Sequence, residues 1–264
     1  MSASTKPLVE LFVKASPTDR NEKGACLIGQ QWFMTLYCMV EKGLIDLRFT
    51  PMSLELPPIN YSRLNAARHL PIAWVEYGTV KGEDISGTVI SSSDELEAFM
   101  SKLGAPNLDA ALTENEVWEA EDVFSSLYVN LMNFIRSGKW NPLSVTLSKL
   151  DDYLAQKAHS FLLSDEPTYV DCQLMPKLQH LRVVLRAYKN MDIPSNLIYL
   201  YSYIKRMYRC QAFIVSCPLD RDILLHYSTK DPLPKSVRLS LLGPDRLLFT
   251  DDDSIPANGH HVGK

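Results

Sequence analysis

The feature that most constrains the fold of this chain is a change of pattern near residue 105. Before it, short apolar and alternating segments typical of β-strands are mixed with helical ones. After it, apolar residues recur only at helical spacing. The segment Gly104 to Asn107, at the change, is rich in residues that break regular structure. Because 264 residues are enough for two domains, we expect an α/β domain followed by an all-helical domain.

The first hundred or so residues predict a β-α-β unit and then a β-β-α unit. Residues 8–13 are an apolar run, and Ile45, Leu47 and Phe49 alternate with charged residues, as strands do. Between them, residues 25–40 carry apolar side chains at four-residue spacing, which predicts a helix. A strand, helix and strand so close together favour a parallel strand pair. The remaining expected elements are a strand at 72–75, a hairpin partner ending near 86–90 and a helix that follows Ser91 to Asp94.

Beyond the change of pattern the chain predicts long helices and a polar tail. The expected helices cover 117–135, 143–154, 168–188 and 195–208, with two shorter ones near 211–216 and 220–227. The expected divisions are an N-terminal domain at 1–103, a linker at 104–113, a helical domain at 114–228 and a tail at 229–264. The tail is rich in Pro, Asp and Gly, so we expect it to be mostly disordered, although 237–249 has enough leucine to dock.

Composition excludes several classes of protein. A net charge of −4 gives no basic footprint for nucleic acid. The five cysteines are scattered without a C-x-x-C pair, which indicates a reduced, intracellular protein with neither a zinc ribbon nor a dithiol redox motif. The first residues lack the apolar core of a secretory signal. No stretch offers the roughly 18 apolar residues of an ordinary membrane-spanning helix.

Cys26 is the first candidate for chemistry. It follows a strand and a loop and lies at the predicted start of the helix at 25–40. Unpaired N–H groups and the helix dipole at such a position favour a thiolate, which raises reactivity. Free cysteine is also among the most frequently buried residue types, so the spacing alone favours an unreactive core thiol. The other four cysteines, Cys38, Cys172, Cys210 and Cys217, are expected to be core residues.

Two further motifs are candidate ligand contacts. In a thioredoxin-like fold a cis proline at Pro71 would leave the backbone of Leu70 free to pair with a peptide-like ligand such as glutathione. Without that fold assignment, an ordinary trans proline before a strand is the simpler interpretation. Ser92, Ser93 and Asp94 begin a predicted helix, whose N-terminus can hold a ligand carboxylate. A plain N-cap is the simpler interpretation here too.

Two other motifs do not indicate a functional site. Thr168 and Asp171 match a helix-capping box, with Asp in place of the usual Glu. This is a structural role, and losing such a cap typically costs about 1 kcal/mol. His260 and His261 are adjacent in the tail and make a poor metal site on their own, so we expect no metal.

Several segments resemble the chloride intracellular channel proteins of the glutathione-transferase-like superfamily, in a form typical of an invertebrate branch. The similarity covers about residues 8–228. Its helical-half motifs are specific, because generic glutathione transferases do not share them. The matching segments include LFVKA at 11–15, Cys26 to Gln30, Phe33-Met34, Phe161-Leu162, Asp171-Cys172, LMPKL at 174–178, Asp192-Ile193-Pro194 and Ser216-Cys217-Pro218.

The resemblance implies a thioredoxin-like N-terminal domain, an all-helical glutathione-transferase-like C-terminal domain and a monomeric cytoplasmic form. It also implies a second form that associates with or inserts into intracellular or plasma membranes and conducts chloride or other anions. The implied partners are membrane lipids, anions and cytoskeletal or membrane proteins. The implied inserting segment is Cys26 to Asp46, and the implied contacts for glutathione as a ligand or cofactor are Leu70, Pro71, Ser93 and Asp94.

The sequence of the segment Cys26 to Asp46 argues against direct insertion into a membrane. A spanning helix needs about 20 apolar residues, and the uninterrupted part of the segment, 32–40, is far shorter. Each charge at mid-bilayer costs roughly 2.5–3.5 kcal/mol, so Glu41 and Lys42 oppose insertion unless they lie near its edge. Insertion would therefore require the N-terminal half to unfold or refold. Vertebrate relatives also have Cys-Pro-Phe-Ser where this chain has CLIG at 26–29, and Gln31 replaces a basic residue proposed to lie near their pore.

Three functions stay open, and we rank them. The first is a membrane-inserting anion channel with a soluble form. The second is a non-enzymatic scaffold that kept the fold, which the altered thiol motif and the leucine-bearing tail favour. The third is a glutathione-dependent monothiol oxidoreductase that uses Cys26, with at most weak activity.

Overall fold

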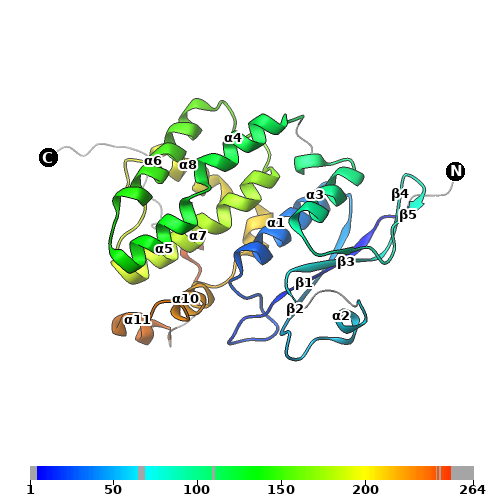
Figure 1. Ribbon diagram of the computed structural model, residues 1–264, viewed down its shortest axis with the longest axis horizontal. Helices are drawn as coiled ribbons and strands as arrows, with labels where there is room; N and C mark the ends of the chain where they lie inside the picture. Colours follow the sequence, from blue (N-terminus) through cyan, green and yellow to red (C-terminus); the bar gives the residue numbers. More distant parts are fainter. Residues whose placement is uncertain (1–4, 65–68, 109–110, 242, 244, 251–264) are drawn as a thin grey trace. The chain divides into compact units, whose positions relative to one another are not determined.

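The computed structural model describes residues 5–64, 69–108, 111–241, 243 and 245–250. The chain divides into two compact units, Met1–Ala111 and Leu112–Lys264. The first combines a sheet with helices and the second is helical, which confirms the predicted fold class (Figure 1). The first unit contains β1 (Leu8–Lys14), α1 (Leu27–Glu41), β2 (Asp46–Met52), α2 (Ile59–Arg63), β3 (Ile72–Tyr77), β4 (Thr79–Val80), β5 (Glu83–Asp84), β6 (Val89–Ile90), α3 (Ser93–Lys102) and η1 (Pro106–Leu108).

The second unit is built from helices throughout its described part. They are α4 (Glu114–Phe124), α5 (Leu127–Ser137), α6 (Asn141–Gln156), α7 (Tyr169–Lys189), α8 (Ile198–Met207), α9 (Gln211–Ser216), α10 (Asp220–Ser228), α11 (Lys235–Ser240) and η2 (Leu248–Thr250).

Strand β1 is the centre of the main sheet, whose strand order is β2-β1-β3-β6. It pairs in parallel with β2, which confirms the expected β-α-β unit, and antiparallel with β3. Strand β6 in turn pairs antiparallel with β3. Because β1 has a neighbour on each side and helices over both faces, every residue from Val9 to Val13 is buried.

The two faces of the sheet are covered by different helices, since successive side chains of a strand point to opposite faces. Phe12 contacts Tyr61 of α2 with its ring centroid 5.4 Å away, in an edge-to-face arrangement. The next residue, Val13, faces α1, because its Cβ lies 3.8 Å from the position that a Cβ on Gly29 would occupy. Figure 1 shows α2 on the face of the sheet opposite α1 and α3.

Helix α7 is the central helix of the second unit and contacts α4, α5, α8 and α10. Its N-terminus is fixed by the fully buried Asp171. One carboxylate oxygen accepts hydrogen bonds from the Thr168 N–H at 2.8 Å and the Thr168 hydroxyl at 2.7 Å. The other accepts from the Leu162 N–H at 3.1 Å and the Tyr203 hydroxyl at 3.0 Å. Burial raises the pKa of Asp171 although these four hydrogen bonds lower it.

The single helix predicted at 117–135 is wrong, because the structure breaks it into α4 and α5 at Ser125 and Ser126. The Ser125 hydroxyl donates to the Asp122 carbonyl at 2.9 Å. The Ser126 hydroxyl lies 3.2 Å from the Thr146 hydroxyl of α6. Serine side chains that bond to nearby carbonyls or to another helix compete with the regular helical ladder and favour a bend.

The C-terminal segment differs from the expectation of disorder beyond residue 228. It contains α11 and η2, and Phe249 packs against Tyr208 and Phe213 with ring centroids 5.1 and 5.3 Å away. The apolar residues within 237–249 explain the docking, because burying them offsets the entropy of ordering the chain. Residues 251–264, including His260 and His261, lie outside the described residues.

We expect His180, buried in α7, to make the stability of the helical unit depend on pH. Burial and the nearby His226 and Lys230 lower its pKa from 6.5 to about 3. Between these values the unfolded chain binds a proton that the folded chain does not, so stability is lost as the pH falls below 6.5. Replacing His180→Gln should reduce the loss of unfolding free energy between about pH 7 and 5 by about 2 kcal/mol, measured by urea denaturation.

The pH dependence of the variant must be compared with that of the parent protein, because Asp220 changes the unfolding free energy with pH in the opposite direction to His180. Burial raises the pKa of Asp220 from 3.8 to about 6, so its contribution falls as the pH rises through that range. The matched control is His159→Gln, since His159 is exposed. A His180→Gln variant with the same pH dependence as His159→Gln would contradict the assignment.

Candidate functional site

The loop after β1 is held against the end of that strand, and this contact positions Cys26. Ala15 and Lys23 form an antiparallel bridge, and the Gly24 N–H donates to the Lys14 carbonyl at 2.8 Å. A Cβ on Gly24 would lie only 2.5 Å from the Ala15 carbonyl oxygen, so only glycine fits there. The Cys26 N–H then donates to the Gly24 carbonyl at 3.0 Å, immediately before α1 begins.

Cys26 is the N-cap residue of α1, as the sequence predicts for the start of that helix, and its thiol is partly exposed. Its side chain makes no capping hydrogen bond. The thiol instead lies over the first turn, 3.7 Å from the position that a Cβ on Gly29 would take. Cys38 follows twelve residues later in the same helix, about 18 Å along its axis. Cys38 is therefore too far along α1 to form a disulfide with Cys26.

The topology of the sheet brings three of the candidate motifs to one edge. Strand β1 ends at this edge and leads to Cys26. Strand β3 is antiparallel to β1, so its first residue, Ile72, pairs with Phe12 at the same edge and Pro71 precedes it. Strand β6 ends there as well, because Ile90 pairs with Ala73. The thiol, the Leu70-Pro71 pair and the start of α3 are thus neighbours along one edge.

The two other motifs at this edge are the Leu70–Pro71 pair and the start of α3. The Leu70–Pro71 peptide bond is cis. Helix α3 is capped by Ser92 and Glu95, which form a capping box, and not by the residues singled out beside them. Within the described part of the chain, no side-chain hydrogen bond or ion pair involves Ser93 or Asp94. Ser93 and Asp94 therefore have donor and acceptor capacity left for a ligand.

The segment from Cys26 to Asp46 is largely buried in the first unit. Trp32, Met34, Leu36 and Met39 have at most 1% of their surface exposed. The amide of Gln30 is also buried, and within the described chain neither its nitrogen nor its oxygen has a hydrogen-bond partner. None of the helices in the described part has the length and apolar character that crossing a bilayer requires.

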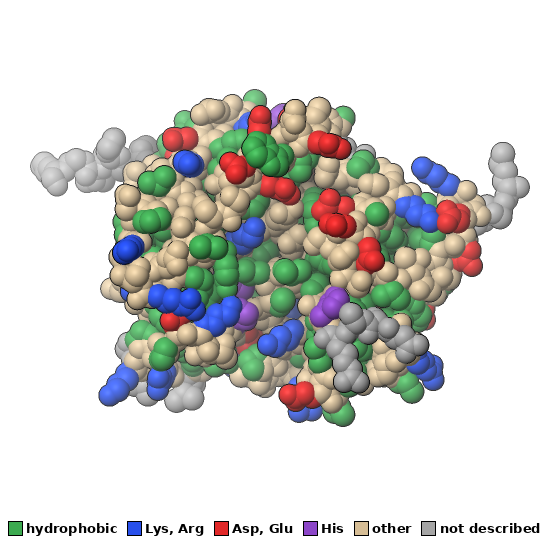
Figure 2. Space-filling view, in the orientation of Figure 1, with side chains coloured by type: hydrophobic (Ala, Val, Ile, Leu, Met, Phe, Trp, Pro, Cys, Tyr) green, Lys and Arg blue, Asp and Glu red, His purple; other side chains and the backbone are tan. Residues whose placement is uncertain are grey.

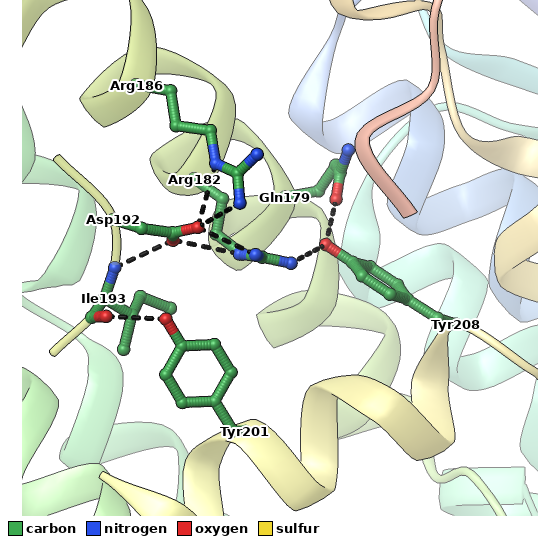
Figure 3. A network of polar contacts seen from close by, with 7 residues as sticks. All are labelled: Gln179, Arg182, Arg186, Asp192, Ile193, Tyr201 and Tyr208. Atoms are coloured by element: carbon green, nitrogen blue, oxygen red, sulfur yellow. Dashed lines mark hydrogen bonds and ion pairs between the residues drawn. The ribbon is translucent and has the colours of Figure 1, made fainter. Parts of the chain in front are cut away.

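A buried ionic network in the second unit was not predicted from the sequence as a unit (Figure 3). Arg182 of α7 is fully buried and donates to both carboxylate oxygens of Asp192, at 3.0 and 2.8 Å. Arg186, one turn further, donates twice to the same carboxylate, at 2.9 and 2.7 Å. Arg182 also donates to the Tyr208 hydroxyl at 2.7 Å, and that hydroxyl donates to Gln179 at 2.8 Å.

The network joins α7 to the chain that follows it. The Ile193 N–H donates to Asp192 at 2.8 Å, and the Tyr201 hydroxyl of α8 donates to the Ile193 carbonyl at 2.6 Å. Burial raises the pKa of Asp192, but hydrogen bonds and charge from Arg182, with help from Arg186, outweigh it and hold the pKa below its ordinary value. The carboxylate is fully occupied, so the network is structural. The sequence signal that could have found it is the Asp192-Ile193-Pro194 motif.

Metal chemistry has no visible site in the parts of the chain that the structure describes. Within them, no group of three or more His, Cys, Asp or Glu side chains is placed to hold a metal ion.

Two curated relatives are similar to this chain over most of its length, whereas no family model matches it. The chloride intracellular channel Clic of Drosophila melanogaster is 33% identical over 230 residues, covering 86% of this chain and 84% of the relative. The chloride intracellular channel exc-4 of Caenorhabditis elegans is 30% identical over 264 residues, covering 92% of this chain and 87% of the relative.

Solved structures agree with these relatives. The crystal structure of EXC-4 from C. elegans, described as a CLIC homologue, superposes with a TM-score of 0.79 at 28% identity and covers 94% of this chain and 95% of that one. Chlamydomonas reinhardtii dehydroascorbate reductase (TM-score 0.64, 16% identity, 84% and 97% covered) shares the fold. Glutathione transferase Omega 2C of Trametes versicolor (TM-score 0.57, 14% identity, 85% and 99% covered) does so too.

We expect the Asp192 network to be essential for the stability of the helical unit. Replacing Asp192→Asn removes the charge that two arginines share and leaves the buried Arg182 without a carboxylate to balance its charge. Breaking a buried pair in this way typically costs about 3–5 kcal/mol, which chemical denaturation would measure. The control is Asp231→Asn, because the pair of Asp231 with Arg136 is partly exposed and should contribute under about 1 kcal/mol. Equal losses in the two variants would refute this role.

Proposed function

The chain belongs to the chloride intracellular channel family, and from this premise we propose that its globular form associates with or inserts into membranes and there conducts chloride or other anions. The observation that carries the proposal is the extent of the relationship, 33% identity across 84% of a relative named as such a channel. The globular form is proposed to be cytoplasmic and its membrane partner to be the lipid bilayer.

Geometry limits how the proposed insertion can occur. Helix α1 has 15 residues, about 22 Å of helix, against a hydrocarbon core of about 30 Å. The whole segment from Cys26 to Asp46 would span about 31 Å as one helix. The turn after α1, where Gly43 has a φ of 72°, would have to become helical, as would the residues that enter β2. Insertion therefore means that α1 leaves the sheet and the first unit refolds.

The contacts of α1 make such a release less costly than its burial suggests. The apolar residues of α1 would exchange one apolar environment for another, so the hydrophobic cost falls on the sheet face that α1 now covers. Leaving the fold breaks no side-chain hydrogen bond of Gln30, because its buried amide has none within the described chain. The charges of Glu41, Lys42 and Asp46 oppose insertion, and Asp46 would also lose its ion pair with Lys6. Partial burial already raises the pKa of Glu41, which favours its neutral form.

A reversible crosslink between α1 and β1 tests the proposal. Val13 Cβ lies 3.8 Å from the Cβ position of Gly29, which suits a disulfide. The double change Val13→Cys and Gly29→Cys, in a Cys26→Ala background that removes the competing thiol, would tie α1 to β1. We expect the parent protein to release chloride from loaded liposomes, the oxidised variant to release none, and reduction to restore release.

The Cys26→Ala background without the crosslink is the control and should release chloride in both redox states. No chloride release by the parent protein, over a range of pH and lipid composition, would refute the channel proposal. Equal release by the oxidised and reduced crosslinked variants would refute the release of α1.

A second candidate function is favoured by the shared sheet edge of Cys26, Leu70 and Ser93. We propose a weak glutathione-dependent oxidoreductase activity, with Leu70, Pro71, Ser93 and Asp94 as contacts for glutathione. The Cys26 thiolate would attack the glutathione sulfur of a mixed disulfide, forming a Cys26–glutathione disulfide and releasing the substrate thiolate, which takes a proton. A second glutathione thiolate would attack that disulfide, giving oxidised glutathione and the free Cys26 thiolate.

Replacing Cys26→Ser should abolish this disulfide reduction, because a hydroxyl cannot form the mixed disulfide. The measurement is the rate of reduction of a small glutathione mixed disulfide, coupled to glutathione consumption. Cys38→Ser is the control, because Cys38 is buried in the same helix. Retention of the parent rate in Cys26→Ser would remove Cys26 from the mechanism.

A further inference from the structure

Helices α4 and α6 of the second unit border a groove. Two adjoining hollows, of about 420 and 400 Å³, lie along these helices. The lining residues that both hollows share are Asp122, Val123, Tyr153 and Gln156. Along α6 the lining extends from Thr146 to Lys157, about 16 Å, which is the length of three helical turns. All of the lining residues belong to the second unit, so the groove is complete within it.

The apolar part of the groove centres on Trp118 of α4. This side chain lines the groove with 66% of its surface exposed, although tryptophan is highly buried on average. Val123, one turn further along α4, and the ring of Tyr153 from α6 continue the apolar lining. Exposed tryptophan is enriched at surfaces that bind other proteins. The groove therefore presents apolar surface that a partner can cover.

The acidic side chains of the groove are not used by the fold. Glu119 and Asp122 come from α4, and Asp152 comes from α6. Within the described chain, none of these three side chains forms a hydrogen bond or an ion pair. Helix α4 has five acidic residues and neither lysine nor arginine. Figure 2 shows Asp and Glu side chains gathered around hydrophobic ones over α4. The groove therefore has free carboxylates for a cationic partner.

The two lysines of the lining, Lys149 and Lys157, both come from α6 and offset these acids only in part. The Nζ of Lys157 lies 4.6 Å from the centroid of the Tyr153 ring, which is a cation–π contact. The groove thus already holds one ammonium group of its own chain against an aromatic face. The more exposed ring of Trp118, beside Glu119, offers a second such face to a cation from outside.

We propose that this groove docks a basic amphipathic helix of a partner protein, with lysine or arginine at Glu119, Asp122 and Asp152 and an apolar face against Trp118 and Val123. An amphipathic helix in a groove is a recurring mode of recognition, in which apolar side chains one turn apart act as anchors. Complementary charge selects the partner and speeds association, and here it disfavours acidic lipids. The inference is independent of anion conduction, because α4 and α6 belong to a different unit from α1.

Titration of a fluorescent synthetic peptide with the full chain, followed by anisotropy, tests the groove. The probe is a peptide of about 12 lysine and leucine residues, patterned as an amphipathic helix of about three turns. We expect it to bind. A peptide with glutamate in place of lysine lacks the complementary charge, and one with serine in place of leucine lacks the apolar face. Each should bind about tenfold more weakly or worse.

Variants at exposed positions locate the binding. Trp118→Ala, and separately Glu119→Gln together with Asp122→Asn, should each weaken binding of the lysine peptide about tenfold. Glu119→Lys together with Asp122→Lys should reverse the preference, so that the glutamate peptide binds more tightly than the lysine peptide. The matched control is Glu55→Gln together with Glu166→Gln, which removes the same charge at exposed acids outside the groove and should bind as the parent does.

Failure of the lysine peptide to bind, or equal binding by the parent, Trp118→Ala and the Glu119→Gln, Asp122→Asn variant, would overturn the proposal. Equal weakening in the control variant would also overturn it, because binding would then follow net charge and not the groove. A dimer of the parent in sedimentation equilibrium that Trp118→Ala dissociates would assign the groove to a second copy instead. Trp118→Ala should leave chloride release from liposomes unchanged, so the two properties fail independently.

Discussion

The pairing of β1 with β2 on one side and β3 on the other is the constraint on which the first unit depends. Five consecutive residues of β1, Val9 to Val13, are buried between helices on both faces. The pairing register of β1 with β2 and β3 then determines which segments lie together at the C-terminal end of β1. It brings the loop that presents Cys26, the cis Leu70–Pro71 bond and the start of α3 to one edge. A slip of one residue would reverse the faces of the strand and separate Val13 from α1.

Helix α1 combines apolar side chains that stabilise the sheet domain with a buried amide that destabilises it. As part of the sheet domain it buries Trp32, Met34 and Leu36, each of which typically contributes about 1.5–3 kcal/mol. The same helix carries the buried amide of Gln30, which lacks a hydrogen-bond partner in the described chain and typically costs about 1–3 kcal/mol. An apolar helix that is held mainly by packing can exchange its environment for another apolar one. That property is what the proposed membrane form needs.

The sequence predicted the elements that depend on local pattern. The β-α-β unit follows from periodicity between residues 8 and 49, the start of α1 at Cys26 from the preceding loop, and the Thr168–Asp171 contact from a three-residue spacing. Features that depend on tertiary contacts were missed or only partly predicted, since the leucines of 237–249 suggested docking without showing where. The bend at Ser125 and Ser126 requires Thr146 of α6. The ordering of the C-terminal segment requires Asp220, 28 residues before Leu248. No local pattern contains either contact.

Helix α1 and the networks around α7 differ in how firmly polar side chains hold them in place. In the helical unit, Asp171 accepts four hydrogen bonds and Asp192 bonds two arginines and a backbone N–H, so each carboxylate is committed to holding helices together. Such networks lose several kcal/mol when one partner is removed, which opposes partial opening. In the sheet unit the buried Glu10 is bound in a similar way, by the Thr50 hydroxyl at 2.7 Å and by Arg48 at 3.6 Å, whereas the side chain of Gln30 in α1 has no hydrogen bond within the described chain. Because rearrangement begins where the fewest bonds must be broken, α1 is the element expected to move while α7 and its networks stay folded.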